Sequence, residues 1–213
     1  MNQVALIDYG VGNLLSVARA LEAAGGKVEL TDKADRIKSA ERIVLPGVGA
    51  FGDCMGELKK RSLIEPVLEF ARGGRPMLGI CVGMQMLLDA GEEFGEHKGL
   101  GIIAGRVALI PDSDANGARH KIPHIGWNAL APRPDGATWK GSILEGIEPG
   151  SPVYFVHSFT AHPADPAKRL ADTDYGGRTI SAAVRSNNVS GTQFHPEKSG
   201  AIGLRMLENF LKL

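Results

Sequence analysis

The chain has 213 residues, 24 basic and 24 acidic side chains, and 43% hydrophobic residues, enough for one sizeable core, so residues 1–213 are predicted to form a single domain. The balanced charge, without a run of Lys and Arg, argues against a nucleic-acid-binding surface. No segment reaches the ~20 apolar residues of a membrane span, and the N-terminal residues lack a signal-peptide pattern. The two cysteines, Cys54 and Cys81, follow no metal or disulfide spacing. We therefore expect a cytoplasmic protein in a reducing compartment, bound neither to nucleic acid nor to a membrane.

The first 75 residues alternate between short apolar runs and helical patterns. Predicted strands cover residues 4–7, 27–30 and 42–45, and predicted helices cover 14–24, 34–40, 51–61 and 64–71. This alternation is typical of a parallel sheet with helices on both faces. The glycines of GVGN lack the full G-x-G-x-x-G pattern, and no Walker lysine follows, so a nucleotide site is not favoured. Cys54 is expected to be a packing residue of its helix.

The third strand runs into a glycine loop, PGVGAF, in which Pro46, Gly47 and Gly49 leave the backbone open. Backbone N–H groups in such a loop are candidate hydrogen-bond donors to a ligand. An ordinary glycine turn is the alternative, and these residues alone do not decide between the two. Ligands of parallel sheets bind beyond the carboxyl ends of the strands, which is where this loop falls.

The stretch PMLGICVGMQMLL, residues 76–88, contains the strongest chemical signal. It predicts a strand over 77–80, a sharp turn at Cys81, and a helix that continues to Leu88. Gly79 and Gly83 flank the cysteine in G-x-C-x-G, the thiol form of a nucleophile elbow, where side chains would crowd the turn. A helix N-terminus also favours thiolate over thiol. A structural buried cysteine is the alternative.

The middle of the chain is less informative. It predicts a strand over 106–110, a polar surface loop over 112–119, and a polar, turn-rich stretch over 161–177. Trp127, in KIPHIGWN, suits either the core or a partner surface. The apolar run 153–159 predicts one buried strand, and its His157 is expected to be a hydrogen-bonded core histidine.

The C-terminal part carries a second candidate for chemistry. Residues 179–184 and 189–194 predict a β-hairpin, and residues 202–211 predict an amphipathic helix that packs back on the sheet. After the hairpin, His195 and Glu197 are separated by Pro196, which biases the histidine to an extended conformation. Residues two apart in an extended chain project to the same side, so the carboxylate can reach the imidazole. A histidine held in this way is a candidate general base for a thiol, although a surface loop would also explain it.

Together, LPGVGAF, GICVGMQ and QFHPEKS resemble the class I (triad) glutamine amidotransferases over nearly the whole chain. DYGVGNLLSV, PHIGWN and YFVHSF are similar to one branch of that family, the glutaminase subunits of imidazole glycerol phosphate synthases in histidine biosynthesis. The resemblance implies an α/β fold with a mainly parallel central sheet, flanking helices and an antiparallel extension. It implies hydrolysis of L-glutamine to glutamate and ammonia, which passes to a (β/α)8-barrel cyclase subunit in a heterodimer. It implies no metal and no organic cofactor.

The resemblance also implies roles for single residues. Cys81 would be the nucleophile, His195 the base and then the acid, and Glu197 the group that orients His195. The oxyanion would be bound by the backbone N–H of Val82 and by the loop of Gly47, Val48 and Gly49. Glutamine would be contacted by Gly49, Gln85, Ser158 and Phe159, and the partner subunit by Asn13, Trp127, Tyr154 and Lys198.

Departures from the family pattern are few. Val82 stands where leucine is frequent, Phe159 where tyrosine is common, and Gly200 where glutamine is frequent. Phe159 removes a hydroxyl beside the expected glutamine pocket. Two other functions remain open: a glutaminase serving a different synthase, and a regulatory subunit on the same fold without turnover.

Overall fold

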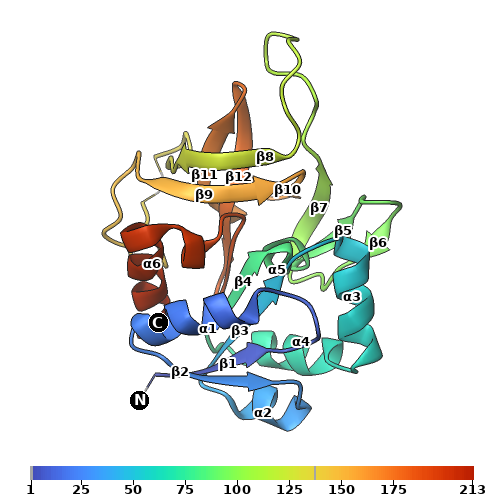
Figure 1. Cartoon of the computed structure of the whole chain (residues 1–213), viewed down its shortest axis with the longest axis vertical. Coiled ribbons are helices and arrows are strands. Elements are labelled where there is room, and N and C mark those ends of the chain that lie inside the picture. Colours follow the sequence, from blue (N-terminus) through green and yellow to red (C-terminus); the bar gives the residue numbers. More distant parts are fainter. Residues whose placement is uncertain (1, 137) are drawn as a thin grey trace.

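The computed structural model describes residues 2–136 and 138–213, and a seven-stranded sheet runs through its centre. The strand order is β11-β12-β13-β4-β3-β1-β2 (Figure 1). The five strands from β13 to β2 are parallel, whereas β12 and β11 extend the sheet in antiparallel fashion. The parallel strands are β1 (Gln3–Ile7), β2 (Lys27–Thr31), β3 (Arg42–Gly47), β4 (Met77–Cys81) and β13 (Val189–Thr192), and the antiparallel ones are β12 (Arg178–Ser186) and β11 (Arg169–Tyr175). The fold class expected from the sequence is confirmed.

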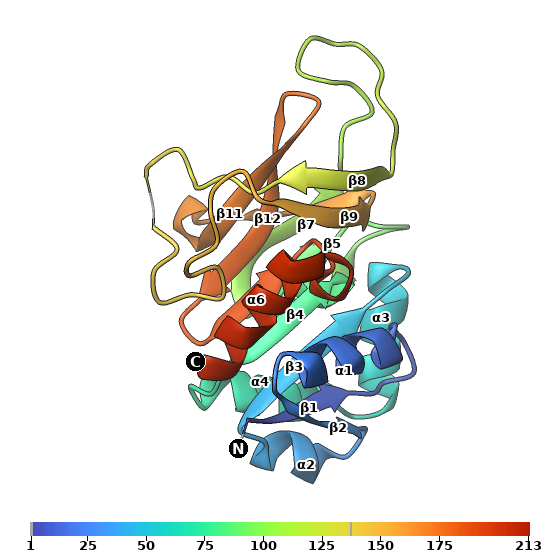
Figure 2. The ribbon, with the colours of Figure 1, turned by 60° about the vertical axis from the view of Figure 1, so that its left-hand side comes forward.

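Helices cover both faces of this sheet, as right-handed crossovers between parallel strands require. One face carries α1 and α6, which contact each other, and the other face carries α2 and α4, which also contact each other (Figure 2). The long helices are α1 (Leu14–Ala23), α3 (Phe51–Lys60), α4 (Ile64–Arg72) and α6 (Gly200–Lys212), and α2 (Ala34–Ser39) is short. Their predicted positions are confirmed within about two residues, because apolar residues repeat along each with helical spacing.

Two smaller sheets lie beyond the central one (Figure 1). One has the order β10-β7-β5-β6, and the other is the antiparallel pair β8-β9. Their strands are β5 (Leu88–Gly91), β6 (His97–Lys98), β7 (Ile103–Leu109), β8 (His124–Ala129), β9 (Pro152–His157) and β10 (Phe159–Pro163). The segment KIPHIGWN, for which no strand or helix was predicted, thus contributes most of β8.

Three predicted elements are wrong in extent. The helix after Cys81, α5 (Val82–Gln85), is a single turn, and Leu88 starts β5. The run 153–159 is two strands, because β9 ends at His157 and β10 begins at Phe159. The stretch 161–177 holds a 3-10 turn, η1 (Pro166–Lys168), and all of β11. Apolar runs alone did not distinguish strand from helix, and the polar strand β11 is stabilised by its pairing with β12.

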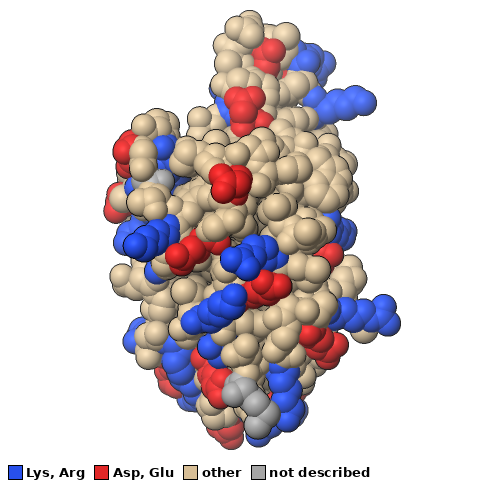
Figure 3. Space-filling view, turned by 90° about the vertical axis from the view of Figure 1, so that its left-hand side faces the viewer, with Lys and Arg blue, Asp and Glu red and all other residues tan. Residues whose placement is uncertain are grey.

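The core is continuous across the helices and the central sheet. Its largest fully buried side chains are aromatic: Tyr9, Phe51, Phe70, Phe155, Phe194 and Phe210. Burying each apolar one contributes about 1.5–3 kcal/mol to stability. On the face shown in Figure 3, acidic and basic side chains are interspersed, in keeping with the balanced charge. Among the described residues, no helix is long and apolar enough to cross a membrane.

Candidate active site

Cys81 sits at the end of β4 in a strained backbone conformation, with φ 55° and ψ −114°. A positive φ is uncommon for a residue with a side chain and marks positions that the surrounding structure holds in place. A Cβ at Gly79 would meet the Gly83 carbonyl oxygen at 2.6 Å, and a Cβ at Gly83 would collide with the Leu45 carbonyl oxygen. The two glycines thus let strand, turn and helix pack without side chains between them, which confirms the predicted elbow.

His195 and Glu197 form the pair that the sequence predicted. His195 has an extended backbone, and Pro196 begins the 3-10 turn η2 (Pro196–Lys198). The His195 Nδ1 lies 2.8 Å from Glu197 Oε1, and both side chains are almost fully buried. The other Glu197 oxygen, Oε2, is buried without a hydrogen-bond partner among the described residues. The carboxylate therefore fixes the imidazole tautomer with the proton on Nδ1 and leaves Nε2 for a second group.

That second group is Cys81, which brings the two candidate stretches together. Burial lowers the pKa of His195, but hydrogen bonds with Cys81 and Glu197 outweigh burial and raise this pKa to about 9. The raised pKa means that the site favours an imidazolium next to the sulfur. A thiol, an imidazole and a carboxylate in hydrogen-bonded sequence can generate a nucleophilic thiolate.

A cavity of about 470 Å³ opens over Cys81 and His195. Its volume suits a small metabolite. Besides these two residues it is lined by Val48, Gly49, Ala50, Val82, Gln85, Glu93, Phe94, Pro123, Val156, His157, Ser158, Phe159 and Lys198. All four residues expected to contact glutamine are in this wall, as are Val48 and Val82 of the expected oxyanion site, whereas Gly47 lies in the strand beneath it.

Gly47 belongs to the sheet and not to a free loop, in contrast to the sequence expectation. It is paired with Cys81 in the register of β3 and β4. Ile43 donates its backbone N–H to the Pro76 carbonyl, on the β4 side. In a parallel strand every second residue directs its backbone N–H and C=O to the same neighbouring strand. Gly47, four residues after Ile43, therefore directs its own N–H and C=O toward β4. Its carbonyl is thereby directed at the N–H that follows Cys81, that of Val82. In this register a carbonyl, and not an N–H of the loop, faces the Val82 N–H.

Two buried side chains donate hydrogen bonds to the carbonyls of the residues on either side of Gly47, which are Pro46 and Val48. The Tyr9 hydroxyl donates to the Pro46 carbonyl at 2.6 Å, and the Cys54 thiol donates to the Val48 carbonyl at 3.3 Å. Burial raises the pKa of Tyr9, and it raises the pKa of Cys54 to about 11, so both remain protonated donors. Cys54 therefore packs in the core, as expected, and also anchors the loop. No sequence pattern indicated the role of Tyr9.

Gln85 is buried, and its amide nitrogen is used within the protein. It donates to the Phe159 carbonyl at 2.9 Å and to Gln193 Oε1 at 2.9 Å. The Phe159 carbonyl also accepts from His157 Nδ1 at 2.8 Å, so both of its lone pairs are engaged. The Ser158 carbonyl accepts from the Ile110 N–H. A ligand would therefore bind the side-chain oxygen of Gln85, and it would contact Phe159 at a group other than the Phe159 carbonyl.

His157 is a hydrogen-bonded core histidine, as predicted. Its Nε2 lies 3.0 Å from Nδ1 of the buried His124. Burial lowers the pKa of His157 to about 3, and burial also lowers the pKa of His124. The neutral His157 thus supports the wall of the cavity by holding the Phe159 carbonyl.

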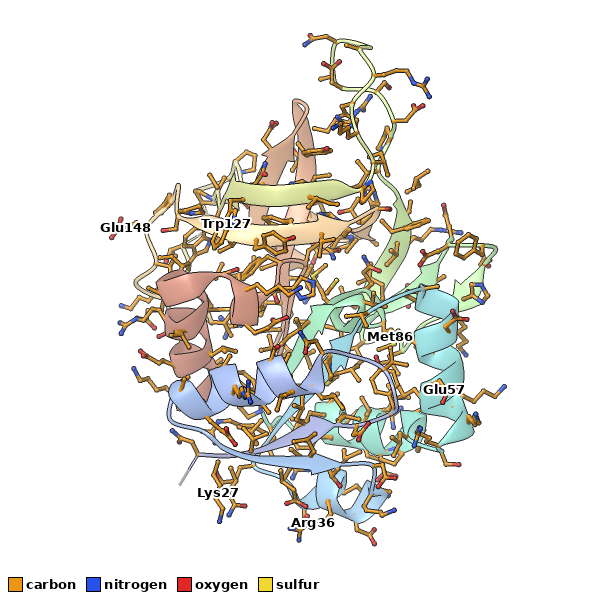
Figure 4. The ribbon with its side chains drawn as sticks, viewed as in Figure 1. Lys27, Arg36, Glu57, Met86, Trp127 and Glu148 are labelled. Carbon is orange, nitrogen blue, oxygen red and sulfur yellow. The ribbon has the colours of Figure 1, made fainter. Side chains whose placement is uncertain are left out.

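Three of the four expected partner-contact residues form one surface cluster. The rings of Trp127 and Tyr154 meet edge to face with centroids 6.0 Å apart, and the Lys198 ammonium lies 5.7 Å above the Tyr154 ring. Trp127 is 55% exposed, so of the two sequence alternatives the structure excludes the core. In Figure 4 it lies at the β8-β9 pair, in the upper half of the view, and Lys27 and Arg36 lie at the bottom. The exposed Asn13 precedes α1, which contacts η2, the turn that carries Lys198.

Comparison with known proteins shows what the chain as a whole is similar to. A family model described as glutamine amidotransferase class-I matches residues 5–213. The chain is 53% identical to the imidazole glycerol phosphate synthase subunit HisH 1 of Legionella pneumophila (strain Lens), over all of both chains. It is 50% identical to the HisH subunit of Rhodospirillum rubrum, over 99% of this chain and 98% of the relative.

Solved structures show the same fold at lower identity. A structure titled PurLQS from Thermotoga maritima has a TM-score of 0.72 and 21% identity, and the match covers 99% of this chain and 97% of that one. A crystal structure titled glutamine amidotransferase has the same TM-score of 0.72 at 17% identity, covering 99% of both chains.

Proposed function

Because the chain belongs to the class I glutamine amidotransferases, and within them to the HisH subunits of imidazole glycerol phosphate synthase, we propose that Cys81, His195 and Glu197 are its glutaminase triad. The protein is the glutaminase subunit of that synthase, and its ammonia serves histidine biosynthesis. The observation that carries the assignment of the triad is that Cys81 and His195 line one cavity, with His195 Nδ1 held 2.8 Å from Glu197 Oε1. The whole chain, residues 1–213, would act as one glutaminase domain.

In the proposed first half-reaction, His195 Nε2 takes the proton of Cys81, and the thiolate attacks the side-chain carbonyl carbon of glutamine. The imidazolium then gives its proton to the leaving nitrogen as the C–N bond breaks, releasing ammonia and leaving a γ-glutamyl thioester. Glu197 keeps Nδ1 protonated and stabilises the positive charge of the imidazolium. Water, deprotonated by His195, cleaves the thioester to glutamate and restores the thiol.

The oxyanion in each half-reaction needs N–H donors, and we propose that the backbone N–H groups of Val82 and of the Gly47–Gly49 loop supply them. Removing one such donor typically costs about 3–4 kcal/mol of barrier height. The pairing of Gly47 with Cys81 directs a carbonyl at the Val82 N–H, so the peptide between Gly47 and Val48 would have to turn before the donors converge. We propose that the partner subunit stabilises the turned form.

The partner is the other subunit of imidazole glycerol phosphate synthase, the cyclase. We further propose that it is a (β/α)8 barrel, that it forms a heterodimer with this chain in the cytoplasm, and that it docks on Trp127, Tyr154, Lys198 and Asn13. The exposed Trp127, packed against the partly buried Tyr154 with a lysine over its ring, is the kind of surface that protein partners cover. Ammonia released at Cys81 would pass directly to the cyclase.

The experiment is to measure glutamate release from glutamine by the purified chain alone, with the cyclase subunit, and with that subunit and its nucleotide substrate. We expect slow turnover alone and a large rise when both are present. A Cys81→Ala complex is the control for glutamate formed without the triad. An unchanged rate would favour a glutaminase of another synthase or a subunit without turnover, and fast turnover by the chain alone would contradict the proposed role of the partner.

A further inference from the structure

Gln193, the residue that follows β13, contacts the sulfur of Cys81. Its side-chain nitrogen donates to Cys81 Sγ at 3.7 Å, and the residue is fully buried. The contact follows from the sheet: β13 and β4 are parallel, with Thr192 paired to Ile80, so the next residues, Gln193 and Cys81, lie side by side at the ends of these strands. The donor therefore reaches the sulfur from the β13 side of the elbow.

The orientation of the Gln193 amide is fixed by its neighbours. The Phe159 carbonyl can only accept a hydrogen bond, so the Gln85 group that faces it is the NH2. The second hydrogen of that NH2 points to Gln193, which must present its oxygen, at 2.9 Å. The Gln193 NH2 is then left to face Cys81. A flipped Gln193 amide would set two NH2 groups against each other, which a buried site does not tolerate.

On the basis of the proposed function, we propose that Gln193 is a further catalytic residue, whose amide N–H stabilises the thiolate of Cys81, while Gln85 and the Phe159 carbonyl hold that amide in the donating orientation. Hydrogen bonds to a charged acceptor are roughly twice as strong as neutral ones, and burial strengthens them further. The donor favours the thiolate over the thiol, so it assists formation of the nucleophile.

Several other groups lie near the sulfur of Cys81, and a variant at position 193 leaves them unchanged. His195 with Glu197 faces the sulfur from the loop after β13, and Tyr9 and Cys54 lie close enough to interact with its charge. The charged side chains in the cavity wall are Glu93 and Lys198. All of these groups remain when Gln193 is replaced by Met, a residue of similar length without a donor.

The test is the rate of alkylation of Cys81 by iodoacetamide, measured against pH on the full chain without glutamine. Peptide mass spectrometry separates Cys81 from Cys54. For Gln193→Met we expect the midpoint of the pH profile to rise by about one unit, and the rate below the midpoint to fall about tenfold. The matched control is Thr192→Val, on the preceding, equally buried residue, whose hydroxyl has no hydrogen-bond partner among the described residues.

Superimposable pH profiles for wild type and Gln193→Met would overturn the proposal. If Thr192→Val shifts the profile as much as Gln193→Met does, the shift is a packing effect and the proposal also fails. Because alkylation needs no turnover, a chain that hydrolyses no glutamine still gives a decisive result. If Gln193→Met does not fold, NMR of the wild type decides. In the wild type, the signals of the Gln193 side-chain NH2 should shift with pH around the midpoint of the alkylation profile. In Cys81→Ala the same signals should not shift there. Wild-type signals that do not respond to this titration would refute the contact.

Discussion

The carbonyl oxygen of Leu45 lies directly against the α-carbon of Gly83, two residues after Cys81, and leaves no space for a side chain there. The obstacle is backbone in the middle of the central sheet, so it cannot move aside as a flexible side chain would. The geometry of the nucleophile elbow therefore depends on a glycine at this position as much as on the cysteine.

Gly83→Ala should lower the free energy of unfolding by about 3 kcal/mol or prevent folding, because the added methyl group overpacks the elbow. Gly56→Ala is the matched control, since Gly56 lies in the middle of α3 with open space around its α-carbon. That variant should be more stable by about 0.5–1 kcal/mol, through its higher helix propensity. Urea unfolding measures both. A Gly83→Ala protein as stable as wild type would contradict the close approach.

Tyr9→Phe should reduce stability by about 1–3 kcal/mol, because the buried Pro46 carbonyl loses its 2.6 Å hydrogen bond without gaining water. Tyr175→Phe removes a bond of the same length, to the Lys121 carbonyl, at an exposed position where water can replace it. We expect the control to cost less than about 1 kcal/mol in thermal or urea unfolding. Equal losses in the two variants would argue against Tyr9 as a buried anchor of the loop.

The pH dependence of stability should reveal the His195 pair. The pKa of His195 is raised to about 9 in the folded protein by hydrogen bonds with Cys81 and Glu197 that outweigh burial, against an ordinary value of 6.5. A raised folded-state pKa adds stability that is complete below pH 6.5 and is lost as pH rises through 9. The full effect is about 3 kcal/mol. Glu197→Gln should therefore flatten the fall in unfolding free energy between pH 6.5 and 9, and parallel curves for the two proteins would refute this.

Cys81→Ala should abolish synthesis that depends on glutamine and leave synthesis from added ammonia intact in the complex with the cyclase. The reason is that only the glutaminase step needs the sulfur, while the cyclase uses ammonia from either source. The measurement is product formation by the reconstituted complex with glutamine or an ammonium salt as the nitrogen source. Loss of both activities would contradict the proposed division between the subunits.

Trp127→Ala should weaken binding of the cyclase at least tenfold, since buried aromatic anchors contribute on the order of 2 kcal/mol or more to an interface. The exposed Trp127 contributes little to the fold, so stability should change by less than about 1 kcal/mol. Leu30→Ala, at the half-exposed edge strand β2, is the control and should leave binding unchanged. Calorimetric titration gives the affinities, and equal affinities for both variants would exclude Trp127 from the interface.

The sequence alone was sufficient to predict those structural features that neighbouring residues encode. Glycines on both sides of Cys81 specified the elbow, and Pro196 between His195 and Glu197 specified the imidazole–carboxylate pair, because each depends on backbone conformations that the residues themselves restrict. The break of the predicted strand at Ser158 had no such local signal. It follows from β9 pairing with β8 while β10 pairs with β7.

The tertiary structure alone decided which distant groups meet. Gln193 and Cys81 are 112 residues apart, and Tyr9 and Pro46 are 37 apart, yet both pairs are in contact. The pairing of Gly47 with Cys81, which directs a carbonyl toward the Val82 N–H, is likewise set by the register of β3 against β4. The sequence by itself indicated the proposed triad residues and their local geometry, since the elbow and the His195–Glu197 pair depend on short-range backbone sterics. The surroundings of the sulfur required the fold, because strand order and register place side chains that no spacing along the chain relates.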